Sequence, residues 1–330
     1  MTTSTDVAAA ARRVQGRVPD FFIVGHAKSG TTALYEMLRR HPQIYMPDAK
    51  EPWFLATDMG ARFQPRRAGN PPHTLEQYLS LFAAATPAQR VGEASSSYLW
   101  SHTAARRIAQ LQPAARIIAI LREPASFLHS LHLQLLQTHV EVKRDLRTAL
   151  ALEDARRQGR RIPRRSHRPQ LLLYSEHVRY TEQLRRYHAE FAPEQVLVLI
   201  YDDFRADNAA TVRGVLRFLD VDESAELGAV EANAAVRVRS PRLRRAARPL
   251  HGGEGTLARA LSAAARLATP GGRGRARLRA LRHRLTYGAP AAADERVMAD
   301  LRRRFRGEVE ALSEYLGRDL VSLWGYDRAE

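Results

Sequence analysis

The sequence contains no cysteine, only three lysines and no long apolar run. The absence of cysteine excludes disulfide bonds, thiol nucleophiles and cysteine-ligated zinc or iron–sulfur centres. The longest apolar stretches, residues 21–25, 117–121 and 196–201, have the length of a β-strand and are far too short to cross a bilayer. The N-terminal segment lacks the charged start and apolar core of a secretory signal peptide. We therefore expect a cytoplasmic protein without a membrane span.

The net charge of +17 is concentrated in one part of the chain. Residues 237–284 hold fourteen arginines and a single acid, Glu254. We predict a basic helical insertion over residues 236–290, which either forms a solvated surface or faces an anion. No phenylalanine, tyrosine or tryptophan lies among these arginines to stack on bases, so the composition does not favour nucleic-acid binding. A basic nucleic-acid-binding protein is the non-enzyme alternative.

Strand-length apolar segments alternate with helical patterns along the chain. Predicted strands cover residues 20–25, 43–46, 115–121 and 195–203. Predicted helices cover residues 31–41, 75–84, 102–111, 171–191, 208–219 and 295–316, and a further long helix starts at Pro124. Strands that are apolar throughout and alternate with helices indicate a central parallel sheet flanked by helices in a three-layer α/β fold.

We predict one domain in this chain. It covers residues 19–330, follows a frayed N-terminal segment of residues 1–18, and contains the basic insertion. A C-terminal helix and tail over residues 295–330 form a helical extension. With 45% hydrophobic and 26% charged residues in 330, the composition is that of a globular protein with a large core.

The segment between the first strand and its helix reads HAKSGTT, residues 26–32. Small residues there let backbone N–H groups converge on an anion, the helix N-terminus adds partial positive charge, and Lys28 adds a full charge. The other candidate anion-binding residues are Ser29, Gly30, Thr31 and Thr32. The segment is P-loop-like, but Lys28 precedes the glycine, whereas the lysine of a nucleoside-triphosphate loop follows it. A P-loop-type nucleotide kinase is therefore only the alternative enzyme reading.

A second candidate anion site begins at Arg122, directly after the strand of residues 115–121. Ser130 follows eight residues later, slightly more than two helical turns, so both side chains face the same end of that strand. An arginine and a hydroxyl suit a phosphate monoester. Ligands of open α/β sheets lie beyond the carboxyl ends of the strands. Two anion sites at neighbouring strand ends indicate a ligand with phosphate groups at both ends.

On these residues the chain resembles the sulfotransferases that use 3′-phosphoadenosine-5′-phosphosulfate (PAPS), in a bacterial branch similar to carbohydrate and heparan-type enzymes. Residues 28–32 (KSGTT) resemble the family's 5′-phosphosulfate loop, and Arg122 to Ser130 resemble its 3′-phosphate motif. The resemblance extends to residues 50–54 (KEPWF), 92–99 (GEASSSYL), Tyr180, 196–204 and 317–325. It covers most of the chain from Pro19 onward, but residues 240–290 match poorly.

The resemblance implies transfer of a sulfuryl group from PAPS to a hydroxyl or amine of a carbohydrate or other small-molecule acceptor, with adenosine 3′,5′-bisphosphate released. It implies that PAPS is bound by Lys28, Ser29, Gly30, Thr31, Thr32, Arg122, Ser130 and Tyr180. Lys28 also has a catalytic role, because it meets the charge that grows on the leaving group. No metal is expected, since positioning and electrostatics suffice and the pair His129 and His132 has no third ligand nearby in the sequence.

Glu51 is the candidate general base. In related sequences with this loop, a glutamate at this position takes the proton of the acceptor. The chemistry requires a carboxylate close to the phosphosulfate that accepts a proton as the nucleophile attacks sulfur. His102 and His132 are the alternative bases. Glu93, in the segment GEAS, is expected to orient loops by hydrogen bonding.

Overall fold

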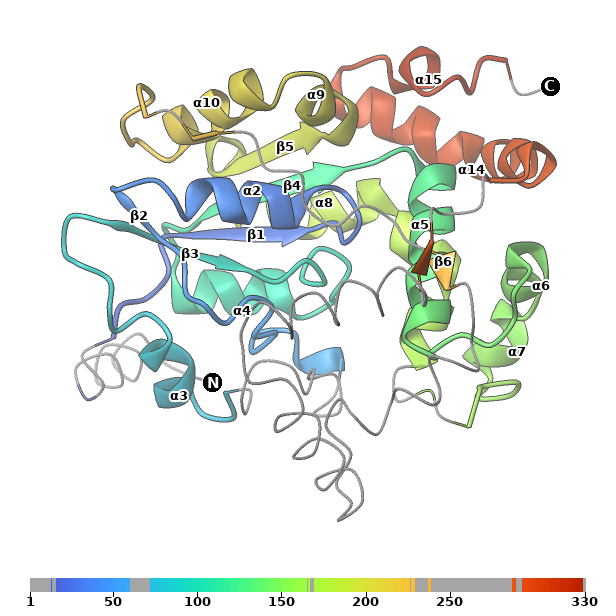
Figure 1. Cartoon of the computed structure of the whole chain (residues 1–330), viewed down its shortest axis with the longest axis horizontal. Coiled ribbons are helices and arrows are strands. Elements are labelled where there is room, and N and C mark those ends of the chain that lie inside the picture. Colours follow the sequence, from blue (N-terminus) through green and yellow to red (C-terminus); the bar gives the residue numbers. More distant parts are fainter. Residues whose placement is uncertain are drawn as a thin grey trace, which may run out of the picture. The chain divides into compact units, whose positions relative to one another are not determined.

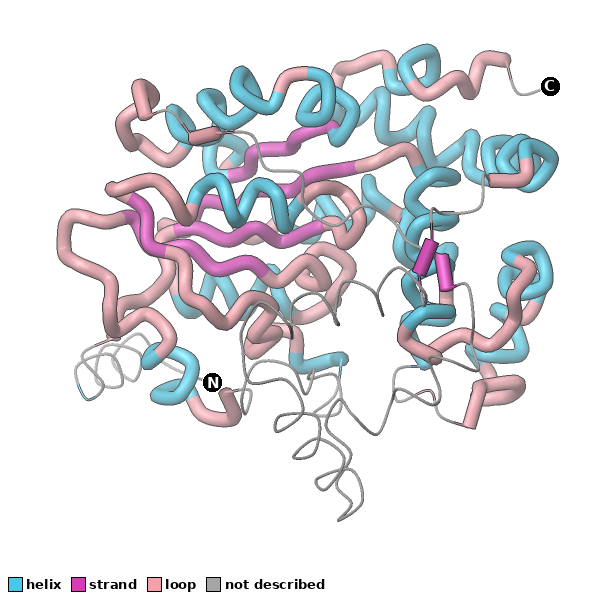
Figure 2. Tube along the Cα trace, in the orientation of Figure 1, coloured by secondary structure: helices cyan, strands magenta, loops and turns pink. Residues whose placement is uncertain are grey.

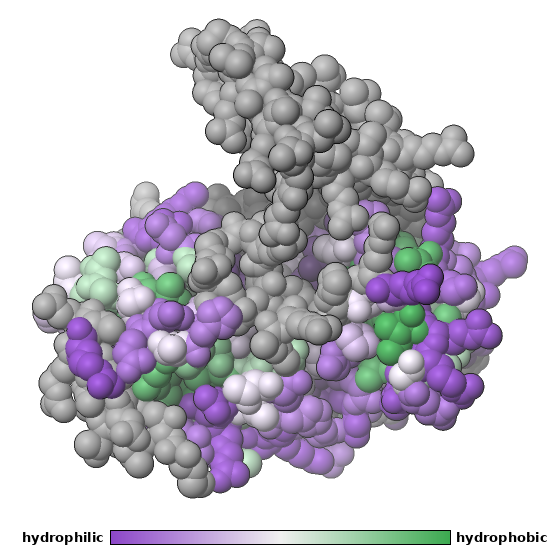
Figure 3. Space-filling view, turned by 90° about the horizontal axis from the view of Figure 1, so that it is seen from below, coloured by the Kyte–Doolittle hydropathy of each residue, from purple (hydrophilic) through white to green (hydrophobic). Residues whose placement is uncertain are grey.

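The computed structural model describes residues 13, 16–59, 72–164, 166, 169–225, 227–228, 237–238, 287–288 and 293–328. The chain divides into two compact units, one formed by Met1–Asn233 with Asp294–Glu330 and the other by Ala234–Ala293. Within the described residues, no helix combines the length and the apolar character that a membrane crossing needs. On the face seen in Figure 3, hydrophilic side chains predominate over the described surface and hydrophobic ones form small groups.

A five-stranded parallel sheet forms the centre of the first unit (Figures 1 and 2). Its strand order is β2-β3-β1-β4-β5. The strands are β1 (Phe21–Gly25), β2 (Ile44–Tyr45), β3 (Arg90–Ala94), β4 (Arg116–Leu121) and β5 (Val196–Ile200). Because all five run in the same direction, their carboxyl ends lie along one edge of the sheet, where the predicted anion-binding segments follow β1 and β4.

Helices cover both faces of this sheet, as the sequence predicts (Figure 1). Phe21 and Ile23 of β1 and Ile120 of β4 form one core with the helices of the first face. These are α2 (Thr31–Leu38), α9 (Tyr201–Ala206) and α10 (Asn208–Phe218). The opposite face carries α4 (Ala104–Leu111) and α8 (Tyr180–His188), which contact each other. The sheet is therefore buried on both sides, which explains the apolar runs in β1, β4 and β5.

Two longer helices lie at the carboxyl edge of the sheet (Figure 1). The helix α5 (Pro124–Gln137) follows β4 and packs against α14 (Glu295–Leu316), which also contacts α8 and α15 (Leu320–Leu323). Shorter elements are η1 (Thr57–Met59), α3 (Leu75–Ser80), α6 (Leu146–Ala151), α7 (Glu153–Arg157), η3 (Pro169–Leu172), η4 (Tyr174–Val178) and η5 (Pro193–Gln195). In the second unit, β6 (Arg237–Val238) pairs antiparallel with β7 (Tyr287–Gly288). The rest of the predicted basic helical insertion lies outside the described residues.

Most predicted elements are present, and the differences have local causes. The strand β3 was not predicted, because Gly92 and Glu93 interrupt its apolar pattern. The helix predicted over residues 171–191 is divided into 3₁₀ turns and α8. The strand predicted to end at 203 ends at Ile200, because Asp202 and Asp203 are acids suited to the first turn of the following α9. The helix α14 has the predicted bounds, and it ends at Gly317, which adopts a left-handed conformation (φ 60°).

Gly92 in β3 provides the first test of this packing. A Cβ atom at Gly92 would lie 2.2 Å from the Phe21 ring and 2.3 Å from the Met46 sulfur, so a side chain must displace the core. We predict that Gly92→Ala lowers the free energy of unfolding by about 1–3 kcal/mol in urea denaturation. Gly214→Ala is the matched control, because an exposed helical glycine with no atom nearby should gain about 0.5–1 kcal/mol. Equal effects of the two substitutions would contradict this account.

Candidate active site

The loop of residues 26–30 joins β1 to α2 at the carboxyl edge of the sheet. Lys28 (φ 65°) and Gly30 (φ 91°) both adopt left-handed backbone conformations. Gly30 also leaves no room for a side chain, because a Cβ atom there would lie 3.0 Å from the Phe204 ring. Gly30 is the N-cap of α2 and offers no side chain to cap it. The first N–H groups of α2 are therefore open to an anion.

Lys28 and Arg122 bring two positive charges together between the ends of β1 and β4. The Arg122 guanidinium donates to the Lys28 carbonyl at 3.0 Å and lies over the Tyr201 ring at 4.9 Å. Burial lowers the pKa of the Lys28 ammonium, and the charge of Arg122 lowers it further. Within the described part of the chain, neither cation pairs with a carboxylate. An anion between them would relieve this repulsion.

Two further residues assigned to this site are buried, and one of them contacts Arg122. Tyr180 starts α8 and donates its hydroxyl to the Arg122 carbonyl at 3.0 Å, so it orients the arginine through its backbone. Ser130 is buried on α5. Glu123 caps α5 by accepting from the N–H groups of its first turn, and it also accepts from the Tyr326 hydroxyl at 2.8 Å. The C-terminal segment thereby supports the start of α5, next to Arg122.

Glu51 lies at the same edge and is held by four donors. One carboxylate oxygen accepts from the Ser96 hydroxyl at 2.8 Å and from the Lys50 ammonium at 3.3 Å. The other accepts from the Ser96 N–H at 2.9 Å and from the Trp53 indole at 2.6 Å. Lys50 also donates to Thr32 at 3.0 Å and so joins Glu51 to the first turn of α2. The structure thus places the candidate base beside the anion-binding loop.

The backbone around Glu51 is strained. Glu51 (φ 63°) and Trp53 (φ 53°) both adopt left-handed conformations, which cost roughly 1–3 kcal/mol in residues other than glycine. Such strain persists where surrounding contacts impose it, and it gathers at functional sites. The residues that hold Glu51 were not predicted to do so. The run of serines after β3 was the available signal, because polar residues at a strand's carboxyl end face the ligand side of the sheet.

Glu93, at the end of β3, is a second carboxyl close to Glu51. Its side chain is fully buried and accepts from the Tyr78 hydroxyl at 3.3 Å. Burial raises the pKa of the Glu93 carboxyl to about 7, and the negative charge of Glu51 acts in the same direction. Glu93 therefore holds a proton below neutral pH.

The two alternative histidines occupy different surroundings. His132 is buried, and its ring nitrogens lie 2.8 Å from the Tyr174 hydroxyl and 3.0 Å from the Arg144 carbonyl. Both nitrogens are therefore used in holding α5 against the next loop. His102 is exposed and lies on the wall of a cavity. Its backbone N–H donates to the Asp58 carboxylate at 2.8 Å.

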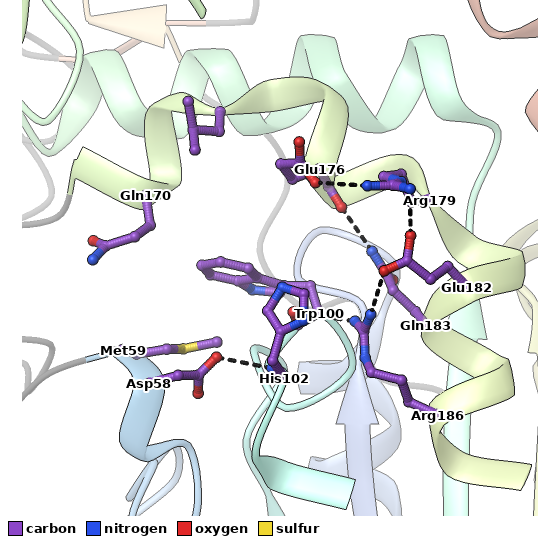
Figure 4. Close-up of a pocket in the computed structure, with 11 residues that line it drawn as sticks. Asp58, Met59, Trp100, His102, Gln170, Glu176, Arg179, Glu182, Gln183 and Arg186 are labelled. Atoms are coloured by element: carbon purple, nitrogen blue, oxygen red, sulfur yellow. Dashed lines mark hydrogen bonds and ion pairs between the residues drawn. The ribbon is translucent and has the colours of Figure 1, made fainter. Parts of the chain in front are cut away.

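That cavity has a volume of about 280 Å³. Three segments enclose it, namely the turn at Asp58, the segment after β3 that carries Trp100 and His102, and the stretch from η3 to α8 (Figure 4). The α8 side carries Arg179 and Arg186. Among the described residues, no group of three or more histidine, aspartate or glutamate side chains gathers in a geometry that could hold a metal ion.

The fold and this site define an α/β protein in which two cations, without carboxylate partners among the described residues, lie at the ends of neighbouring strands. The model of the sulfotransferase family matches residues 19–225, more than half of the chain, and the chain therefore belongs to the sulfotransferase family. The structure of a sulfotransferase from Alicyclobacillus acidocaldarius is similar to it, with a TM-score of 0.65 and 25% identity over 93% of this chain and 98% of that one.

Curated relatives carry more specific names. Carbohydrate sulfotransferase 15 of Mus musculus is 30% identical over 149 residues, which cover 34% of this chain and 26% of the relative. The bifunctional heparan sulfate N-deacetylase/N-sulfotransferase 3 of Homo sapiens is 27% identical over 209 residues, 62% of this chain and 22% of the relative. This chain thus aligns with only about a quarter of the length of these relatives.

The raised pKa of Glu93 predicts a dependence of stability on pH. The folded protein binds this proton up to about pH 7, whereas the unfolded chain releases it near 4.5. Stability due to Glu93 is therefore present below the unfolded pKa and is lost as the pH rises through about 7, by roughly 1–3 kcal/mol. We expect Glu93→Gln to be more stable relative to wild type at pH 8 than at pH 5 in urea denaturation.

The exposed variant Glu190→Gln serves as the control and should keep the pH dependence of the wild type. If the Glu93→Gln difference is the same at both pH values, the carboxyl does not titrate in this range.

Proposed function

We propose that this protein transfers the sulfuryl group of PAPS to a hydroxyl or amine of a carbohydrate or other small-molecule acceptor and releases adenosine 3′,5′-bisphosphate. The observation that carries the proposal is the pair Lys28 and Arg122, two cations without carboxylate partners in the described chain, at the ends of neighbouring strands. Membership of the sulfotransferase family supports it. The order of lysine and glycine in the loop does not favour a nucleotide kinase.

The two anion sites suit the two ends of this donor. Lys28, the hydroxyls of Ser29, Thr31 and Thr32 and the free N–H groups of α2 are the groups for the 5′-phosphosulfate. Arg122 and Ser130 are the groups for the 3′-phosphate. Gly30 allows the backbone to approach the ligand closely, and Tyr180 holds Arg122 in place. No metal ion enters the proposed step.

The proposed reaction is an in-line displacement at sulfur. A bond forms between the acceptor atom and sulfur while the bond from sulfur to the bridging phosphate oxygen breaks, and the leaving nucleotide keeps that electron pair. Glu51 takes the acceptor's proton, and Lys28 with the loop N–H groups stabilises the charge that grows on the leaving phosphate.

Lys50 controls whether Glu51 can act as a base. A carboxylate offers about four lone-pair positions, and four donors surround this one. The contact with Lys50, at 3.3 Å, is the longest of the four. When the Lys50 ammonium turns toward the sulfuryl oxygens, one lone pair of Glu51 becomes free for the acceptor proton.

Two expectations from the sequence remain parts of this proposal. They are a cytoplasmic location and a single domain over residues 19–330.

The 3′-phosphate site can be tested with nucleotides alone. We predict that adenosine 3′,5′-bisphosphate raises the Tm of the wild type and that ATP does so much less. Arg122→Ala should weaken bisphosphate binding by about 2 kcal/mol or more, because a charge-assisted contact is lost, and Ser130→Ala by about 1 kcal/mol. Isothermal titration calorimetry measures both.

Arg213→Ala, which removes an exposed arginine on α10, is the matched control and should bind the bisphosphate like the wild type. A loss at Arg122→Ala that is equally large for nucleotides without a 3′-phosphate would assign the residue a structural role instead.

Substitutions of Lys28 and of Glu51 should have different effects on donor affinity and turnover. Lys28→Ala should lower both donor affinity and turnover, because its charge meets the donor before and during transfer. Glu51→Gln should leave donor affinity nearly unchanged and reduce turnover roughly 10²- to 10⁴-fold, the range for loss of a general base. Single-turnover rates at saturating PAPS separate chemistry from binding.

The control for this pair is Glu194→Gln, an exposed acid in η5 that should show wild-type turnover. Wild-type turnover in Glu51→Gln would transfer the assignment of the base to His102, since both ring nitrogens of His132 are already hydrogen-bonded.

A further inference from the structure

The charges that line the cavity of Figure 4 neutralise one another. Arg179 lies 3.3 Å from Glu176 and 2.6 Å from Glu182, and Arg186 lies 2.9 Å from Glu182. Arg157, outside the cavity, also pairs with Glu176 at 2.8 Å. Both arginines of the described lining therefore already have carboxylate partners. A strongly anionic acceptor would have to break these pairs to find a positive charge.

Asp58, the remaining acid of the lining, is equally engaged. Although burial opposes it, hydrogen bonds from Ser101, His102 and Thr103 hold the pKa of the Asp58 carboxyl below its usual value. It accepts from the Ser101 hydroxyl at 2.6 Å and from the Thr103 hydroxyl at 2.8 Å. This carboxylate therefore stays ionised, and its hydrogen bonds stabilise the turn at Asp58. Because its oxygens are already engaged, it has little capacity to bind a cationic acceptor.

The groups with spare hydrogen-bonding capacity in this lining are uncharged or weakly basic. The His102 imidazole and the Gln170 amide have no hydrogen-bond partner among the described residues, and both residues line the cavity (Figure 4). Between them lies the indole of Trp100, whose ring is backed by His177 at 4.5 Å. An indole face suits the apolar face of a ring, and an imidazole with an amide suits hydroxyl groups.

The cavity is joined to the candidate base by two segments that run side by side. The chain from Glu51 to Asp58 is bonded to the chain after β3, by Trp53 N–H to the Ser95 hydroxyl at 3.1 Å and by Thr57 N–H to the Thr103 hydroxyl at 3.1 Å. Glu51 lies at one end of these two bonded segments, and the cavity lies at the other end. His177, behind Trp100, also contacts His26 of the anion-binding loop, with ring centroids 6.1 Å apart.

We propose that this cavity binds the acceptor through one uncharged, hydroxyl-bearing ring that lies against Trp100 and bonds to His102 and Gln170. The inference rests on the proposed sulfotransferase function and adds the class of acceptor, a neutral hydroxylated molecule rather than a polyanionic chain. A volume of about 280 Å³ suits one small ring, because it lies just below the range of ligand sites, which hold about 300–1,000 Å³.

The test compares uncharged rings with a polyanion. The uncharged probes are methyl β-glucoside, 4-nitrophenyl β-glucoside and a simple phenol, and the polyanion is a heparan oligosaccharide. Binding is read by saturation-transfer NMR in the presence of adenosine 3′,5′-bisphosphate, and transfer is read with labelled PAPS. We expect at least one uncharged probe to bind and to be sulfated more efficiently than the oligosaccharide.

Variants of the lining show whether binding occurs in this cavity. Trp100→Leu and Gln170→Ala should each raise KM for the preferred uncharged probe, by about tenfold for Trp100→Leu, with kcat altered much less. Both should bind adenosine 3′,5′-bisphosphate like the wild type. The matched control is Gln158→Ala, an exposed amide outside the cavity, which should leave KM unchanged.

The outcomes separate this inference from the function on which it rests. Failure of the wild type to bind the bisphosphate or to transfer label to any acceptor counts against the proposed function. Preference for the heparan oligosaccharide, failure of every uncharged probe to bind, or an unchanged KM in both cavity variants overturns the inference, and the bisphosphate affinity stays as an independent measure of the donor site.

Discussion

The hydrogen bond from the Arg122 guanidinium to the Lys28 carbonyl joins the two strand ends on which the site depends. It holds two cations together at half-buried positions, an arrangement that is unfavourable without an anion. The parallel sheet makes it possible, because β1 and β4 are neighbours and end at the same edge. The fold therefore holds the charges of Lys28 and Arg122 close enough to repel each other. A ligand with two or three negative charges would offset this repulsion.

Contacts with neighbouring helices hold Arg122 in place, so that it does not move away from Lys28. Tyr180 holds its carbonyl from α8, while Glu123 caps α5 and is itself held by Tyr326. The C-terminal segment is further fixed by a bidentate pair between Arg318 and Asp203 of α9. The tail therefore braces the helices that flank the anion site, although it follows the family match in sequence by about 100 residues.

Glu51 and Glu93 show how one sheet edge gives two carboxyls different surroundings. Glu51 accepts from four donors, including the Lys50 ammonium. Glu93 is fully buried among hydroxyl groups, and burial raises its pKa to about 7. Only Glu51 is partly exposed, as a base that meets an incoming acceptor must be. The strained backbone at Glu51 is the conformational cost of presenting it there.

The sequence by itself determined four of the five strands of the central sheet, their alternation with helices and the loop that follows the first strand, because apolar periodicity and residue order are local signals. The tertiary structure decided which of Glu51, His102 and His132 lies beside that loop, because residues far apart in sequence meet only when strands pair. It also decided that Arg179 and Arg186 have carboxylate partners, whereas Lys28 and Arg122 have none among the residues that the structure describes. A charge count cannot distinguish these arginines, since whether a cation is free depends on which carboxylate folds next to it.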